Sequence, residues 1–146
     1  MFNRILVVCM GNICRSPLGE AALKELLPNK SVRSAGIATK ESGLIGHGAE
    51  STMKSVSLKH GFDLDEHKAQ QLTQDLCDDS DLILVMEPAH VDLVAIIAPN
   101  ARHKTLLLGQ WSVGTIDDPY QKGQQAFGLA LQQVLQASRQ WSQKLS

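Results

Sequence analysis

Apolar residues alternate along the chain between short continuous runs and longer segments with helical spacing. Four runs predict buried strands, at residues 5–8, 32–35, 82–86 and 104–108. Continuous apolar runs are typical of parallel strands that are covered on both faces. Because helical segments follow these runs, the order of elements predicts an α/β fold with a parallel sheet and helices on both faces.

Four segments have the spacing or the end signals of helices. The first begins after Arg15, has Leu18, Ala22 and Leu26 on one predicted buried face, and ends at Pro28. The others are residues 50–60, which Gly61 ends, residues 88–98, which precede Pro99, and residues 124–146. The last helix has an apolar stripe for packing on the sheet: Phe127, Ala130, Val134, Ala137, Trp141 and Leu145.

Length and composition agree with one domain over residues 1–146. The chain has 146 residues, 43% of them hydrophobic, without a linker, repeat or low-complexity stretch. Its 14 basic and 15 acidic residues nearly balance, which argues against a broad nucleic-acid-binding face. We find neither a signal peptide nor a spanning segment, so we expect a cytoplasmic protein without stable membrane insertion. Three cysteines without an export signal favour thiols over disulfides.

The most informative segment lies between the first strand and the first helix. It begins with Cys9 and ends with Arg15, and Gly11 and Asn12 between them tolerate positive φ. Backbone N–H groups that curl around one point bind anions, above all at a helix N-terminus. The segment therefore predicts a phosphate-binding loop, made of Met10, Gly11, Asn12, Ile13, Cys14, Arg15 and Ser16.

Side chains of the loop supply the chemistry. A helix N-terminus and a neighbouring cation stabilise a thiolate, so we expect Cys9 to be ionised at neutral pH. Arg15 can grip two phosphate oxygens with its planar fork. Ser16 can cap the helix or donate its hydroxyl to Cys9. A buried structural cysteine beside an ordinary turn is the simpler alternative, but the complete set of residues between a strand and a helix favours the phosphate site.

At this point the sequence resembles the low-molecular-weight protein tyrosine phosphatases. The loop matches their pattern Cys-x-Gly-Asn-x-Cys-Arg-Ser-Pro, and their Asp-Pro-Tyr element occurs at residues 118–120. Similarity at residues 34–36, at residues 81–86 and in the C-terminal helix extends the resemblance over nearly the whole chain. Because Gln121 stands where a second tyrosine would follow, the chain is more similar to the bacterial exopolysaccharide-associated branch.

The resemblance implies a single three-layer domain with a four-stranded parallel sheet, and hydrolysis of phosphotyrosine through a cysteinyl-phosphate. Cys9 would be the nucleophile, Arg15 the phosphate ligand and Asp118 the general acid. Neither a cofactor nor a metal is implied. From the residues alone, Asp117 and Asp118 are equal candidates for the acid, and an Asp-Asp-Pro run is also typical of an exposed turn. The family register selects Asp118.

Further roles follow from the same resemblance. Hydrogen bonds from Ser34 and His67 would hold Asn12, although His67 by itself reads as a surface residue. Gln70 stands where the family has an arginine.

A hydrophobic slot would admit the phenyl ring of the substrate, with Met10 and Tyr120 as walls and Leu44, in the loop of residues 37–45, opposite them. Trp111 could lie at the rim of the slot or anchor the loop from below.

Cys14 lies close to Cys9 in sequence and, by resemblance, would form a reversible disulfide that protects the nucleophile. Its alternative is an inert thiol packed under the helix. Cys77 is most simply a structural thiol.

Two rival functions remain. A thioredoxin-coupled arsenate reductase has the same fold but needs two cysteines after the third strand, and none follows Met86. A non-catalytic phosphotyrosine-binding module would not need Cys9 or Asp118, and both are present. The bacterial branch implies a phosphotyrosine protein substrate, the tail of a membrane tyrosine kinase that controls capsule or exopolysaccharide export.

Overall fold

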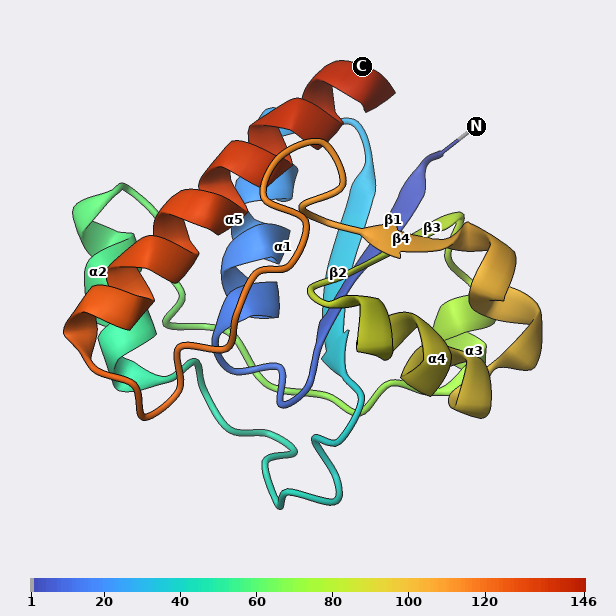
Figure 1. The fold of residues 1–146 in the computed structure, drawn as a ribbon, viewed down its shortest axis with the longest axis horizontal. Helices are drawn as coiled ribbons and strands as arrows, with labels where there is room; N and C mark the ends of the chain where they lie inside the picture. Colours follow the sequence, from blue (N-terminus) through green and yellow to red (C-terminus); the bar gives the residue numbers. More distant parts are fainter. Residues whose placement is uncertain (1) are drawn as a thin grey trace.

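Four parallel strands form one sheet at the centre of the computed structural model, which describes residues 2–146 (Figure 1). The strands are β1 (Arg4–Cys9), β2 (Ser31–Gly36), β3 (Leu82–Val85) and β4 (Thr105–Leu107). Their order is β2-β1-β3-β4, and each neighbouring pair is parallel. The predicted four-stranded parallel sheet is therefore confirmed.

Helices cover both faces of this sheet. Figure 1 shows α1, α2 and α5 on one side of the strands and α3 and α4 on the other. Their bounds are α1 (Arg15–Leu26), α2 (Ser51–Lys59), α3 (Gln74–Asp78), α4 (Pro88–Ile97) and α5 (Gln124–Leu145), with a 3₁₀ helix η1 at Pro99–Lys104. None of the helices in the described part of the chain is long and apolar enough to cross a membrane.

Alternate residues of β1 supply two separate hydrophobic clusters. Ile5 and Val7 pack in one cluster with residues of α1 and α5, whereas Leu6 and Val8 pack in the other with residues of α4. All four side chains are almost completely buried. A continuous apolar run is therefore required because successive side chains of a strand point to opposite faces, and helices cover both.

Two expectations about the helices need correction. Leu26 is 40% exposed rather than buried, because it is the last residue of α1 and Leu27, where the chain leaves the helix, is buried instead. The helices α3 and η1 were not predicted. With five and six residues they are too short for an apolar period, and only the Thr73 cap and Pro99 mark their starts.

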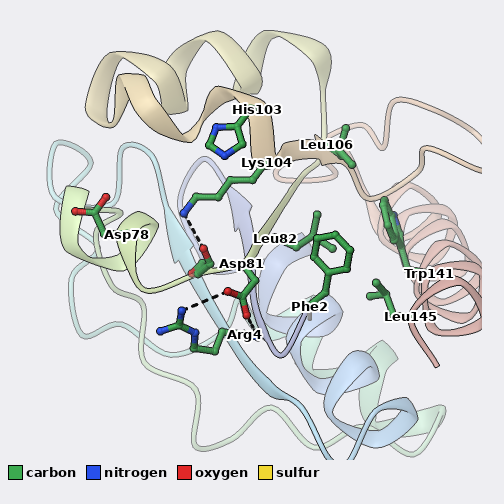
Figure 2. A pocket seen from close by; sticks show the side chains of 11 residues that line it. Phe2, Arg4, Asp78, Asp81, Leu82, His103, Lys104, Leu106, Trp141 and Leu145 are labelled. Atoms are coloured by element: carbon green, nitrogen blue, oxygen red, sulfur yellow. Dashed lines mark hydrogen bonds and ion pairs between the residues drawn. The ribbon is translucent and has the colours of Figure 1, made fainter.

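A hollow of about 570 Å³ lies at the amino ends of the strands (Figure 2). Two of its basic side chains already have partners: Arg4 is 3.3 Å from Asp81, and Lys104 Nζ donates to two backbone carbonyls at 2.7 Å. Trp141 and Leu145 line its apolar side. The loop that begins at Cys9 lies at the other edge of the sheet, where β1 ends.

Candidate active site

The loop from Cys9 to Arg15 connects the carboxyl end of β1 to the first residue of α1, as predicted. Asn12 has a φ of 62°, which agrees with the expected curl of the loop. Gly11 differs from expectation, because its φ is not positive. A Cβ atom at Gly11 would instead lie 3.1 Å from Leu44 Cδ1. The missing side chain at Gly11 thus leaves room for the close approach of the loop that carries Leu44.

The sulfur of Cys9 lies beside a hydroxyl group. Cys9 is buried, and its Sγ is 2.9 Å from Ser16 Oγ. Of the two roles considered for Ser16, contact with Cys9 is the one observed, and no side chain caps α1. A hydroxyl that donates to a thiolate stabilises its negative charge.

Arg15 is held in place through one nitrogen of its guanidinium group. Nη1 donates to Glu87 Oε2 and to the backbone oxygen of Ile116, both at 2.7 Å. Nε is buried and has no hydrogen-bond partner within residues 2–146, and Nη2 lies 3.9 Å from Asp118 Oδ2. The Nε and Nη2 donors form the edge that can hold two oxygens of an anion.

Sequence reasoning missed both partners of Arg15 Nη1. Glu87 follows β3, and a charged residue directly after a buried strand could have been placed at the same edge of the sheet as Cys9. The Ile116 carbonyl has no such signal, because any residue type supplies a backbone oxygen.

Asp118 reaches the same cavity from the loop between β4 and α5. Its side chain is 44% exposed, and its Oδ1 accepts a hydrogen bond from the Tyr120 N–H at 3.0 Å. Asp117 is exposed and does not line the cavity. The geometry thus separates two carboxyl groups that their residue types alone left equal.

The cavity above Cys9 has a volume of about 290 Å³. Its walls include the predicted Met10, Leu44 and Tyr120, together with Ser42, which was not singled out. The complete lining is Cys9, Met10, Gly11, Ile13, Cys14, Arg15, Ser42, Leu44, Asp118 and Tyr120. A buried cysteine, a buried arginine and a half-exposed carboxyl group therefore line one cavity together with apolar side chains.

Comparison with known proteins identifies this arrangement. Residues 4–146 match the family described as "Low molecular weight phosphotyrosine protein phosphatase". The chain belongs to this family. It is 48% identical to the "Probable low molecular weight protein-tyrosine-phosphatase AmsI" of Erwinia amylovora, over 100% of this chain and 99% of the relative. It is 45% identical to Etp of Escherichia coli K12, over 99% and 96%.

Solved structures agree with the sequence relatives. Wzb of Vibrio vulnificus in complex with benzylphosphonate superimposes with a TM-score of 0.96 at 49% identity, over 99% of each chain. Family membership and these relatives make the chain a protein-tyrosine phosphatase. Within residues 2–146, no group of three or more His, Cys, Asp or Glu side chains is arranged to hold a metal ion.

Asn12 is the centre of a buried hydrogen-bond network in the phosphatase. Its Nδ2 donates to Ser16 Oγ at 2.7 Å and to Ser34 Oγ at 2.9 Å, and its Oδ1 accepts from the backbone N–H of Gln70 at 2.9 Å. Ser34 in turn donates to Glu20. Ser34 thus accepts a hydrogen bond from Asn12, whereas the resemblance had implied that Ser34 donates.

His67 contacts the main chain of the loop rather than the Asn12 side chain. Its Nε2 is 2.6 Å from the backbone oxygen of Asn12, so the contact is to the peptide and not to the amide side chain. Gln70, which replaces the family arginine, also donates through its side chain to the Ser34 carbonyl at 2.9 Å. Both residues connect the phosphate loop to the segment that follows α2.

The cysteines and Trp111 have different environments. All three cysteines are free and buried. Burial, then the charges of Cys9, Asp118 and Glu50, raise the pKa of Cys14, which keeps it a thiol. Burial also raises the pKa of Cys77. Trp111 is 46% exposed, packs edge-to-face on Trp141 with ring centroids 5.6 Å apart, and does not line the cavity, so it is not a rim residue.

Proposed function

We propose that Cys9, Arg15 and Asp118 perform the phosphatase reaction, with Cys9 as nucleophile, Arg15 as phosphate ligand and Asp118 as general acid and base. One observation carries this assignment. The buried Arg15 Nε has no partner in the described chain, although its neighbour Nη1 has two. Burying a donor without an acceptor is costly, and a phosphoryl oxygen would supply the acceptor.

The first step transfers the phosphoryl group to sulfur. The Cys9 thiolate attacks phosphorus, and the bond from phosphorus to the tyrosine oxygen breaks with its electron pair on that oxygen. Asp118 gives its proton to the departing phenolate. Arg15 and the N–H groups of residues 10–16 stabilise the negative charge on the equatorial oxygens.

The second step releases inorganic phosphate. Asp118, now a carboxylate, accepts a proton from water as the water oxygen attacks phosphorus. The bond between sulfur and phosphorus breaks, and its electron pair returns to Cys9. The Ser16 hydroxyl, 2.9 Å from that sulfur, stabilises the thiolate as leaving group.

The assignment is tested by hydrolysis of p-nitrophenyl phosphate and of a phosphotyrosine peptide in EDTA. Cys9→Ser is expected to abolish turnover, and Asp118→Ala to lower kcat by roughly 100-fold, the usual size of a general-acid contribution. Asp117→Ala is the matched control, since it removes the adjacent carboxyl group without touching the cavity. Turnover that survives Cys9→Ser would overturn the mechanism.

Two further outcomes would favour the rival functions. Tight binding of the phosphopeptide by the unmodified protein without hydrolysis would indicate a binding module. Thioredoxin-dependent consumption of arsenate would indicate an arsenate reductase, although no cysteine follows Met86.

We propose phosphotyrosine as the substrate group because the cavity combines an anion site at its bottom with apolar walls. Leu44 and Tyr120 are among the residues that line the slot. The related Wzb of Vibrio vulnificus was solved with benzylphosphonate, an aromatic ring joined to a phosphonate. The expected preference is a kcat/KM for a phosphotyrosine peptide that exceeds that for the matching phosphoserine peptide by more than tenfold, since serine is too short to bring its phosphate past these walls.

The physiological partner that we propose is the autophosphorylated, tyrosine-rich tail of a membrane tyrosine kinase of capsule or exopolysaccharide production, reached from the cytoplasm. Similarity to AmsI, Etp and Wzb supports this proposal. A kinase fragment carrying its phosphorylated tail should lose phosphate to the phosphatase and not to Cys9→Ser. Equal rates on this tail and on unrelated phosphotyrosine peptides would argue against a dedicated partner.

A further inference from the structure

A buried histidine lies behind the arginine of the phosphate site. His90 is in the first turn of α4 and is 3% exposed. It does not line the catalytic cavity, so it cannot touch a substrate there. Histidine is seldom buried unless its ring nitrogens have a polar neighbour, which makes the surroundings of this side chain informative.

The polar neighbour of His90 is the carboxylate that holds Arg15. His90 Nε2 lies 3.6 Å from Glu87 Oε2, and the same oxygen accepts the hydrogen bond from Arg15 Nη1 at 2.7 Å. The other ring nitrogen, Nδ1, is buried and has no partner in the described chain. The imidazole therefore directs its one polar contact at Glu87.

Glu87 needs such a neighbour. It precedes the first residue of α4, but its side chain caps no N–H of the helix and is 32% exposed. A carboxylate in this position has two competing states, hydration and capping of its own helix. Arg15 is fully buried and cannot follow the carboxylate into water, so a moved Glu87 would leave a buried cation with one partner fewer.

We propose that His90 is a positioning residue that holds the Glu87 carboxylate on Arg15 Nη1 and so aims the Nε and Nη2 edge of Arg15 at the phosphoryl group. The inference rests on the proposed role of Arg15. The contribution of His90 is geometric, because a small rotation of the Arg15 guanidinium group would misplace both donors at once.

The protonation state of the imidazole agrees with this role. Burial, and next the charge of Arg15, lower the pKa of His90, and the opposing influence of Glu87 and Asp118 does not cancel them. The ring is then neutral at pH 7, and an Nε2–H group 3.6 Å from Glu87 attracts the carboxylate electrostatically without adding a second cation beside Arg15. These three are the charged groups that face His90, from α1, from the start of α4 and from the loop after β4.

The test compares His90→Phe, which keeps a flat ring without a donor, with His90→Gln, whose side-chain amide reaches the place of Nε2. We expect His90→Phe to lower kcat/KM for p-nitrophenyl phosphate about tenfold, as expected for a misplaced binding group. Inhibition by inorganic phosphate should weaken in the same variant, because the ligand edge of Arg15 binds it too. His90→Gln should stay within about threefold of the unmodified enzyme.

A double-mutant cycle tests whether His90 acts through Glu87. In a Glu87→Gln background the further change His90→Phe should cost little, because the carboxylate to be positioned is already gone. An equal cost of His90→Phe in both backgrounds would overturn the proposal.

Val94→Ala is the control for loss of stability. Val94 is fully buried one turn later in α4, so its truncation should lower the melting temperature and leave kcat/KM unchanged. If His90→Phe behaves like this control, the histidine is only structural and the proposal fails. Should His90→Phe not fold, His90→Asn replaces it, because the shorter amide lies near Nδ1 and not near Nε2.

The two proposals fail separately. Activity that survives Cys9→Ser would remove the proposed mechanism, whatever the His90 variants do. An inactive Cys9→Ser with an undisturbed His90→Phe would remove only the role of His90.

Discussion

Ser16 Oγ lies 2.9 Å from Cys9 Sγ and at the same time accepts a hydrogen bond from Asn12 Nδ2 at 2.7 Å. Because the amide supplies a proton to the hydroxyl oxygen, the hydroxyl proton is free to point at the sulfur. The network beneath the loop thus orients Ser16 toward the thiolate form of Cys9.

Ser16→Ala removes this donor without changing the size of the core appreciably. We expect kcat to fall roughly 10- to 100-fold, the range that a hydrogen bond to a charged group of 1.5–3 kcal/mol supplies. Stopped-flow measurement of the phenolate burst should show slower breakdown of the cysteinyl-phosphate. Ser57→Ala is the control, because Ser57 is also buried but its hydroxyl has no partner in the described chain. A Ser16→Ala enzyme with unchanged kcat would contradict the role.

Replacement by alanine is expected to have opposite effects on stability at Gly36 and at Gly128. A Cβ atom at Gly36 would lie 2.8 Å from the Met10 carbonyl oxygen and 2.9 Å from the Gly11 carbonyl carbon, so Gly36→Ala pushes against the phosphate loop itself. We expect a loss of about 1–3 kcal/mol in the free energy of unfolding, typical of overpacking, and a clear drop in kcat/KM.

Gly128 lies inside α5, and a Cβ atom there would meet nothing within 4 Å. Gly128→Ala should therefore stabilise the protein by roughly 0.5–1 kcal/mol and leave kcat/KM unchanged. Urea unfolding and steady-state kinetics on both variants check the pair. A Gly36→Ala enzyme of normal activity would show that the loop can yield.

The phosphate loop could be predicted because its information is local. Cys9 and Arg15 lie in one short segment between an apolar strand and an amphipathic helix, and this order by itself indicates an anion site at the sheet edge. The placement of Asp118 needed the family register, since nothing local distinguishes it from Asp117. In the structure Asp118 lines the cavity and Asp117 does not, a difference that depends on how the loop after β4 folds over the site.

The groups that support the site were less predictable. Glu87 and Glu20 contact Arg15 and Ser34 through the tertiary fold, from positions that no apolar period marks. Gly11 shows a different limit. The glycine at position 11 was attributed to backbone conformation, whereas its φ is not positive and a Cβ atom there would lie in close contact with Leu44. A sequence pattern identifies a special glycine without saying which of the two reasons applies.

Asp81 makes stability depend on pH far from the catalytic site. The backbone N–H of Arg4, then its side chain, lower the pKa of Asp81, which also accepts from the N–H of Asn3. A carboxyl whose pKa is lower in the folded state contributes stability above its ordinary pKa and loses it as pH falls through the folded value. The contribution is therefore present at pH 7 and lost in strong acid.

Asp81→Asn should accordingly destabilise the protein at pH 7, and the difference from the unmodified protein should shrink toward pH 3. Urea unfolding across this range measures both curves. Asp79→Asn is the control, because Asp79 is exposed and its ion-pair contact with Arg33, at 4.0 Å, is long and weak. A difference for Asp81→Asn that stays constant with pH would exclude the carboxylate as the cause.

Cys14 lines the same cavity as Cys9 but should not react like it. Burial above all raises the pKa of Cys14, and the thiolate is the form that iodoacetamide alkylates. At pH 7 we expect one alkylated residue, Cys9, with inorganic phosphate slowing its modification because both occupy one site. Peptide mass spectrometry should find Cys14 and buried Cys77 unmodified until urea unfolds the chain. Alkylation of Cys14 as fast as that of Cys9 would contradict this, and would mean that the loop opens readily enough to expose and ionise its second thiol.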